Sequence, residues 1–141
     1  PAGVPSRTLP PDADRKVSAR ARAILGARAP HDVGQAAVVA QGLCLGIETI
    51  QGTDALLRFV AQNPVRMPDP EGGRGVLVKA PMEGQDARLD VPAIGPDTIR
   101  HAADAGLSGL VIEAGAVMVL GREEVVALAD AAGLFILSDA P

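Results

Sequence analysis

One short segment of the chain, residues 79–90 with the sequence KAPMEGQDARLD, gathers side chains that suit phosphate chemistry. It contains a lysine, an arginine and three acids, which is more charge than a buried turn tolerates. The segment follows the apolar stretch 75–78, whose pattern predicts a strand. Open α/β sheets bind ligands beyond the carboxyl ends of such strands, and from there the ammonium of Lys79 can reach a bound phosphate.

Asp86 is the acid of this segment whose setting best suits a metal ion. It follows the flexible Gly84 and the polar Gln85, so its carboxylate can point into a cleft. A hard cation such as Mg²⁺ takes oxygen ligands from one or two carboxylates together with substrate phosphates. The alternative is an exposed loop of solvated charges in which Arg88 pairs with Asp90, and the residues alone favour neither interpretation.

A second candidate site is the stretch ETIQGTD at residues 48–54. Glu48 ends a predicted strand, and Thr53 and Asp54 begin a predicted helix. The free N–H groups and the partial positive charge of a helix amino terminus attract phosphate. The structural interpretation is stronger on pattern alone, because Thr53 is a natural helix cap and Asp54 complements the helix dipole.

A third candidate is Glu113, which follows a predicted strand and could face the same crevice as Lys79. An isolated acid at a strand end is more often solvated than functional. His31 and His101 have no metal-ligand spacing to each other or to a cysteine, so we expect ordinary surface residues there. Serine-hydrolase, P-loop and zincin motifs do not occur.

The elements that must position these residues alternate between strands and helices. Strand patterns occupy residues 36–40, 43–47, 76–78, 110–112 and 134–137, and helical patterns occupy 12–28, a stretch from 53 onward, 97–105 and 122–132. The two-residue turn Gln41–Gly42 predicts an antiparallel hairpin. The fold class expected is α/β, with a mixed, partly parallel sheet, an amino-terminal antiparallel hairpin and helices packed on it.

Finer expectations concern helix ends and boundaries. Gly106 and Gly133 are each predicted to end a helix just before a strand. The helix that starts near Thr53 is expected to place its apolar residues on one face, namely Leu56, Phe59 and Val60. The proline-rich residues 1–11 are predicted to be an arm or linker remnant, and residues 12–141 a single domain.

Composition excludes several classes of protein. The chain has 141 residues, a net charge of −4 and 1% aromatic residues, which does not suit nucleic acid. Cys44 is the single cysteine, so no intrachain disulfide forms. No apolar run reaches the roughly 18 residues of a membrane span, and the start does not resemble a signal peptide. These features fit a cytoplasmic protein, and the missing initiating methionine indicates a fragment of a longer chain.

An ordered series of short pieces carries a family resemblance. The pieces are DVGQA at 32–36, GTDA at 52–55, VKAP at 78–81, GQD at 84–86, DVPAIGP at 90–96, GL at 106–107, EAG at 113–115 and AGLF at 132–135. Together with Glu48, this set resembles the carboxyl-terminal domain of the LpxI-type UDP-2,3-diacylglucosamine pyrophosphatases, over residues 12–137.

The resemblance implies an activity, a cofactor and site residues. Members of that family hydrolyse UDP-2,3-diacylglucosamine to 2,3-diacylglucosamine 1-phosphate (lipid X) and UMP in lipid A synthesis, with Mg²⁺. The match to Gly-Gln-Asp transfers the essential metal-site aspartate to Asp86. By position, Glu48 and Asp54 are further predicted metal ligands, and Lys79 is a predicted catalytic cation. Expected substrate contacts are Thr53, Gly84, Gln85 and Glu113. Many relatives have Glu where this chain has Gln51, to which no ligand role is assigned.

The resemblance also implies partners and a location. Full-length members carry an additional amino-terminal domain, which is absent here, so the isolated chain is expected to be inactive. The substrate is a lipid-linked UDP-sugar, which places the protein in the cytoplasm with peripheral contact at the inner membrane. The alternative is a non-catalytic module that binds a phosphate-sugar or nucleotide, or that forms a homodimer through its hairpin edges.

Overall fold

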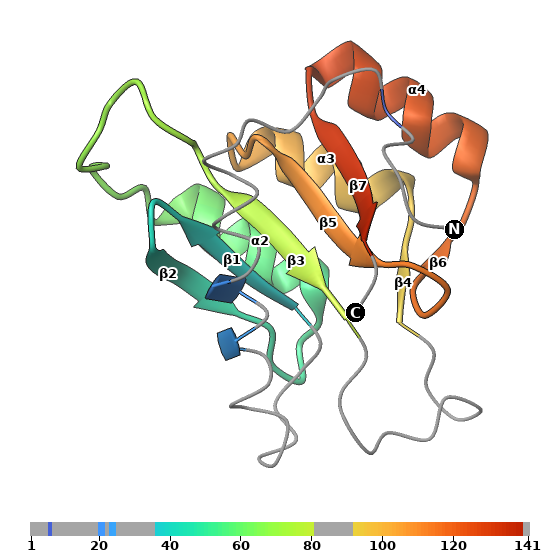
Figure 1. The fold of residues 1–141 in the computed structure, drawn as a ribbon, viewed down its shortest axis with the longest axis horizontal. Coiled ribbons are helices and arrows are strands. Elements are labelled where there is room, and N and C mark those ends of the chain that lie inside the picture. Colours follow the sequence, from blue (N-terminus) through green and yellow to red (C-terminus); the bar gives the residue numbers. More distant parts are fainter. Residues whose placement is uncertain (1–5, 7–19, 22, 25–35, 81–91, 140–141) are drawn as a thin grey trace.

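A mixed five-stranded sheet forms the centre of the protein (Figure 1). The computed structural model describes residue 6 and residues 20–21, 23–24, 36–80 and 92–139. The five strands are β1 (Ala36–Ala40), β2 (Leu43–Ile47), β3 (Val76–Lys79), β5 (Gly109–Glu113) and β7 (Phe135–Asp139).

The sheet order is β2-β1-β3-β5-β7. Strand β1 runs antiparallel to both β2 and β3, whereas β3, β5 and β7 are parallel to one another. Strands β2, β3, β5 and β7 therefore all point the same way. The predicted mixed sheet with an amino-terminal antiparallel hairpin is confirmed.

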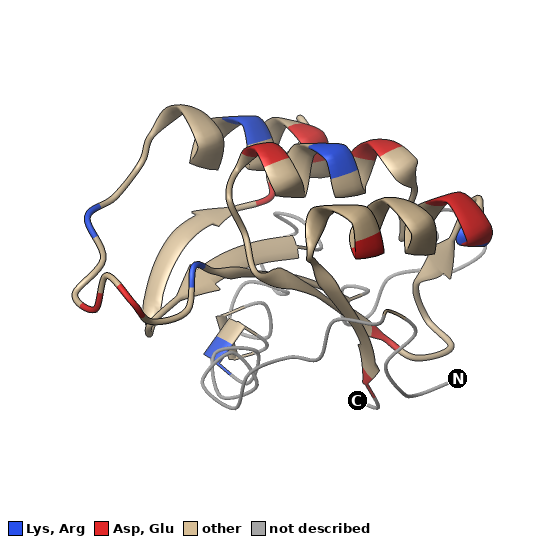
Figure 2. Ribbon diagram, turned by 90° about the horizontal axis from the view of Figure 1, so that it is seen from above, with Lys and Arg blue, Asp and Glu red and all other residues tan. Residues whose placement is uncertain are grey.

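Three helices cover one face of this sheet, as Figure 2 shows in a view turned by 90° from that of Figure 1. They are α2 (Thr53–Gln62), α3 (Pro96–Asp104) and α4 (Arg122–Ala132). Their apolar residues join the inward-facing residues of the strands in the main core, with Leu57, Leu77 and Ile99 at most 1% exposed. Burial of aliphatic side chains between helices and sheet is the main stabilising contribution in a chain with so few aromatic residues.

The opposite face of the sheet has a smaller apolar cluster. It contains Val39, Val78, Val111 and Phe135 from the strands together with Ala21, and Ile24 packs against it. The described residues 20–21 and 23–24 are helical. They fall within residues 12–28, where a helix was predicted, and the other residues of that range lie outside the described residues.

The hairpin turn matches the sequence pattern. Gln41 and Gly42 both have positive φ, 50° and 79°, as the twist of a two-residue hairpin requires. The side chain of Gln41 also holds the connection before β3, because its Nε2 donates to the carbonyl of Asp69 at 2.7 Å and its Oε1 accepts from the Asp69 N–H at 2.9 Å. The predicted ends of α3 and α4 are also confirmed, since Gly106 and Gly133 follow these helices with φ of 73° and 71°.

Three details differ from the sequence-based expectations. A second sheet, made of β4 (Ala93–Ile94) and β6 (Met118–Val119), was not predicted; strands of two residues are too short to show a period. Phe59 is 53% exposed, and Leu57 is buried in its place. Thr53 is not the cap of α2, because Gly52 occupies that position and Thr53 is the first helical residue. No helix of the described segments is long and apolar enough to cross a membrane.

Candidate functional site

The carboxyl ends of four strands meet along one side of the sheet, which we call the carboxyl edge (Figure 1). Glu48 directly follows β2, Lys79 ends β3 and Glu113 ends β5. The register places Lys79 opposite Ile112, one position before Glu113. The topology therefore brings all three of these predicted site residues to the same edge.

Three of the buried polar side chains at this edge form one connected group, which we call the buried polar network. The Thr53 hydroxyl donates to Oε1 of Glu48 at 2.8 Å, and Nζ of Lys79 donates to the Thr53 Oγ1 at 2.9 Å. Nζ of Lys79 also donates to the carbonyl of Ala93 at 2.7 Å. Glu48, Thr53 and Lys79 are 7%, 8% and 7% exposed.

Each member of the network is fixed by the backbone around it. The N–H of Glu48 donates to the carbonyl of Ala36 at 2.8 Å, which extends the hairpin by one bond. Lys79 pairs with the same Ala36 from the other side of β1. Thr53 sits in the first turn of α2, and Ala93 begins β4. The network thus joins β2, α2, β3 and β4 at one point.

The electrostatics of this group follow from its burial. A buried cation and a buried carboxylate are each costly to remove from water, and hydrogen-bonded partners offset that cost. Here the Thr53 hydroxyl links the two charges, because a threonine can accept from an ammonium and donate to a carboxylate at once. Donor and acceptor are therefore matched in both of these hydrogen bonds.

Asp54 and Glu113 are predicted site residues with other surroundings. Asp54 is half exposed, and its Oδ2 is 4.0 Å from Nε2 of His101 on α3. Side chains alternate along a strand, so Glu113 shares the sheet face of Val111, opposite the helices, whereas Lys79 shares the helix-covered face of Leu77. The remaining predicted site residues, Gly84, Gln85 and Asp86, lie outside the described residues.

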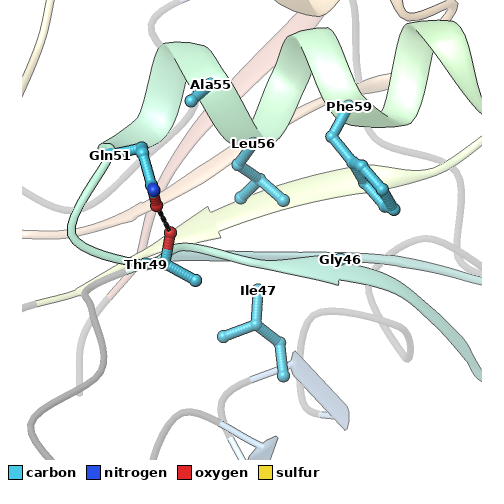
Figure 3. Close-up of a pocket in the computed structure, with 7 residues that line it drawn as sticks. All are labelled: Gly46, Ile47, Thr49, Gln51, Ala55, Leu56 and Phe59. Atoms are coloured by element: carbon cyan, nitrogen blue, oxygen red, sulfur yellow. Dashed lines mark hydrogen bonds between the residues drawn. The ribbon is translucent and has the colours of Figure 1, made fainter.

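An apolar pocket of about 340 Å³ lies beside the network, between β2 and the start of α2 (Figure 3). Its lining residues are Gly46, Ile47, Thr49, Gln51, Ala55, Leu56 and Phe59. The Thr49 hydroxyl donates to Oε1 of Gln51 at the end nearest the carboxyl edge. Gly46 allows the close approach of the helix, since a Cβ there would meet Leu56 Cδ1 at 2.6 Å.

Comparison with known proteins decides the family. A family model described as the LpxI C-terminal domain matches residues 1–137 of the chain. The chain belongs to the LpxI C-terminal domain family. It is similar to the UDP-2,3-diacylglucosamine pyrophosphatase LpxI of Caulobacter vibrioides, with 50% identity over 111 residues. The aligned region is 78% of this chain and 40% of that relative, so the chain spans about two fifths of the relative's length. The resemblance inferred from the short motifs is confirmed.

The described residues of this LpxI domain do not by themselves supply a metal site. Among them, no group of three or more His, Cys, Asp or Glu side chains is placed to hold an ion. Glu48 accepts a hydrogen bond from Thr53, and Asp54 lies beside His101. Mg²⁺ coordination by Glu48 and Asp54 stays a prediction, and so does the metal-site role of Asp86.

The sequence was enough to predict the residues of the buried polar network, but not the hydrogen bonds that join them. Lys79, Thr53 and Glu48 were all predicted site residues, but their mutual hydrogen bonds and the bond to Ala93 were not foreseen. The one signal available was the co-occurrence of an acid, a hydroxyl and a lysine at predicted strand and helix ends. Outside the site, hydrogen bonds to Asp97 and Glu124 raise the pKa of the exposed Arg100 guanidinium.

Proposed function

We propose that this chain is the carboxyl-terminal part of an enzyme that hydrolyses the diphosphate of UDP-2,3-diacylglucosamine, with lipid X and UMP as products. The observation that carries this proposal is the 50% identity, over 78% of the chain, to a relative that bears the name of this activity. The match of the family model to residues 1–137 supports it.

The carboxyl edge is the part of the chain that we assign to this reaction. Cleavage of a diphosphate develops negative charge on phosphate oxygens, and preorganised positive groups stabilise that charge. In this proposal Asp86 holds Mg²⁺, whose chemistry is to neutralise the diphosphate and polarise the attacked phosphorus. Lys79 contributes a fixed positive charge close by, since it ends β3 and the segment that contains Asp86 begins at the next residue.

Hydrolysis is proposed to need more of the protein than this chain. The chain spans 40% of the length of its Caulobacter vibrioides relative. In the proposal the remaining part supplies the other wall of the substrate cleft, so the isolated chain does not release UMP. We also propose that the enzyme works in the cytoplasm, with peripheral contact to the membrane that holds its lipid substrate.

The role of Asp86 is tested in a protein of full family length that carries this chain. The change Asp86→Asn is expected to reduce UMP release at least about a hundredfold, the effect of losing one strong electrostatic stabiliser. The matched control is Asp104→Asn, an exposed acid at the end of α3. This end of α3 lies at the opposite side of the sheet, where the N–H of Ser108 bonds to the carbonyl of Gly75 ahead of β3.

Two results would contradict the assignment. Near-normal turnover by Asp86→Asn means that this carboxylate holds no essential ion. An equal loss in Asp86→Asn and Asp104→Asn means that the effect is general rather than local to the carboxyl edge. A wild-type protein that binds UMP and Mg²⁺ but cleaves nothing would instead favour the non-catalytic binding module.

A further inference from the structure

The apolar pocket between β2 and α2 lies at the edge of the sheet and is accessible from outside (Figure 3). Phe59, one of its lining residues, is 53% exposed, so the space is not enclosed by the core. Its volume of about 340 Å³ falls within the range of roughly 300–1,000 Å³ that small-molecule sites occupy. The pocket can therefore admit a ligand without any opening of the fold.

Gly46 and Ala55 are the small residues that leave this space unfilled. Ala55 and Phe59 are four positions apart on α2 and so lie on the same face of the helix. On the strand side, Gly46 has no side chain, and a Cβ there would meet Leu56 Cδ1 at 2.6 Å. Figure 3 shows the ring of Phe59 at one end of the gap and residues 49 and 51 at the other. The pocket is thus elongated and runs along α2.

The lining of the pocket suits a hydrocarbon. Of the described residues that line it, none is charged. The hydroxyl of Thr49 already donates to the Gln51 side chain, which uses the proton of that hydroxyl. A nucleotide base or a sugar would bring donors and acceptors that aliphatic walls leave unpaired, at a high cost. An alkyl chain has no polar groups, and its transfer from water into such a pocket is favourable.

One end of the pocket adjoins the carboxyl edge. Thr49 and Gln51 belong to the connection from β2 to α2. This connection begins at Glu48 and leads to Thr53, which are both members of the buried polar network. Ile50, in the middle of the connection, is 98% exposed and adds apolar surface there. A ligand that spans both places must carry a polar part and a hydrocarbon part.

We propose that this pocket binds one acyl chain of the substrate, with the methyl end of the chain toward Phe59 and the sugar toward the carboxyl edge. The name of the Caulobacter vibrioides relative specifies a UDP-linked diacyl sugar, which joins an anionic group and hydrocarbon chains in one molecule. The choice of this substrate as the source of the chain rests on the proposed function, whereas the affinity of the pocket for an alkyl chain does not. Ala55 and Phe59 then determine which chain lengths fit.

The first test titrates hexanoate, octanoate and decanoate, below micelle formation, into the chain labelled with nitrogen-15. Saturable NMR shifts are expected at the backbone amides of Gly46, Ala55 and Phe59. Each methylene that becomes buried strengthens binding by up to roughly fourfold, so Kd should fall at least about fivefold from each acid to the next. The amide of Ser108, which bonds to the carbonyl of Gly75 at the other end of the sheet, should not shift.

A variant that fills the pocket tests whether binding is local. Ala55→Phe adds a ring to the wall formed by α2 and is expected to weaken decanoate binding at least about tenfold, the effect of excluding two or more methylenes. The matched control is Ala103→Phe, at an exposed alanine of α3, which should keep the wild-type Kd. If Ala55→Phe does not fold, Phe59→Gln removes an apolar wall at an exposed position and should weaken decanoate binding at least about threefold.

The second test measures hydrolysis in a protein of full family length. Ala55→Phe is expected to lower kcat/KM for a substrate with long acyl chains at least about tenfold, mainly through KM, because binding common to ground state and transition state is lost. For an analogue with acetyl groups in place of the long chains, kcat/KM should stay within about twofold of wild type, since the missing methylenes leave nothing for the ring to displace. A purely structural effect would lower both values alike.

Each outcome decides the proposal. Absence of saturable shifts at the three pocket amides overturns it, and so does equal binding of decanoate by wild type and Ala55→Phe. Shifts at these amides on raising the protein concentration alone would overturn it in favour of a second copy of the chain. Decanoate binding with an equal loss of hydrolysis on both substrates would mean that the pocket does not hold the substrate's chain. A wild-type full-length protein without hydrolase activity refutes the proposed function, while the titration still decides whether the pocket takes an alkyl chain.

Discussion

The buried polar network predicts an unusual order of stabilities when its charges are removed. Lys79→Met takes away the cation but leaves the Glu48 carboxylate at 7% exposure. The two hydrogen bonds through Thr53 set the charged groups on the order of 5 Å apart, where attraction amounts to about 3 kcal/mol at an effective dielectric constant of ~20. Removal of one partner from a buried pair costs roughly 3–5 kcal/mol. This is a large part of the roughly 5–15 kcal/mol that stabilises a typical domain.

The double variant Glu48→Gln plus Lys79→Met is expected to be more stable than Lys79→Met alone, by about 1 kcal/mol or more. In the double variant no buried charge of this pair remains, and neutral replacement of a buried pair is often tolerated. Glu48→Gln alone leaves the Lys79 ammonium buried without this carboxylate and should also be destabilised. The loss should be smaller than in Lys79→Met, because the ammonium keeps its hydrogen bonds to Thr53 and to the Ala93 carbonyl.

Far-UV circular dichroism in urea is the suitable assay, since the chain has no tryptophan or tyrosine to report unfolding by fluorescence. The free energies of unfolding of the wild type, both single variants and the double variant form a complete thermodynamic cycle. A double variant destabilised by the sum of the two single effects would show that the charges are not coupled. That result would refute the electrostatic interpretation of the network.

Other predictions address the scaffold and can use the same unfolding assay. Gly109→Ala is expected to lower the free energy of unfolding by roughly 1–3 kcal/mol through overpacking. The reason is that a Cβ at this position would come within 2.5 Å of the Phe135 ring and carbonyl oxygen. An unchanged urea midpoint would contradict the close approach of β5 and β7. Gly42→Ala should lower the free energy of unfolding by about 1 kcal/mol, because the backbone there is left-handed, with φ of 79°. Nothing lies within 4 Å of the added Cβ, so no steric clash contributes. A stabilised variant would contradict the conformation of this turn. Arg100→Met should leave the urea midpoint unchanged, because its ion pairs with Asp97 and Glu124 are exposed, and a marked loss would show that these pairs matter.

The sequence was enough to predict those elements that depend only on a few neighbouring residues. The hairpin followed from Gln41–Gly42 between two apolar runs, and the ends of α3 and α4 followed from Gly106 and Gly133. Turn and cap geometry depends on a few neighbouring residues, which the sequence shows directly. The alternation of strands and helices was enough for the parallel portion of the sheet.

What could not be predicted depends on contacts between distant residues. Thr53 has the residue type of a helix cap, but it is the first residue of α2, and its hydroxyl bonds to Glu48 and Lys79 once the fold brings the end of β3 to the start of α2. Phe59 fits the apolar face of a helix, yet α2 lies over the edge strand β2, where few neighbours remain to cover the ring, and half of it stays exposed. Such outcomes are set by tertiary packing, which overrides local preference.

The residues of the candidate site could be predicted from the sequence, but their positions relative to one another could not. Lys79, Glu48 and Thr53 were expected near phosphate or metal, and the structure gathers them at one edge with 2.8–2.9 Å contacts. Asp54 has a different neighbour, His101, because it lies one residue further along α2. The predicted role of Asp86 depends on residues that the structure does not describe.

The most direct test of the central claim is product analysis with UDP-2,3-diacylglucosamine as substrate. The protein of full family length that carries this chain is incubated with Mg²⁺, in parallel with the isolated chain. The account predicts that the full-length protein releases UMP and 2,3-diacylglucosamine 1-phosphate in equal amounts, and that the isolated chain releases neither. Absence of both products from the full-length protein, or release of UDP in place of UMP, would contradict it.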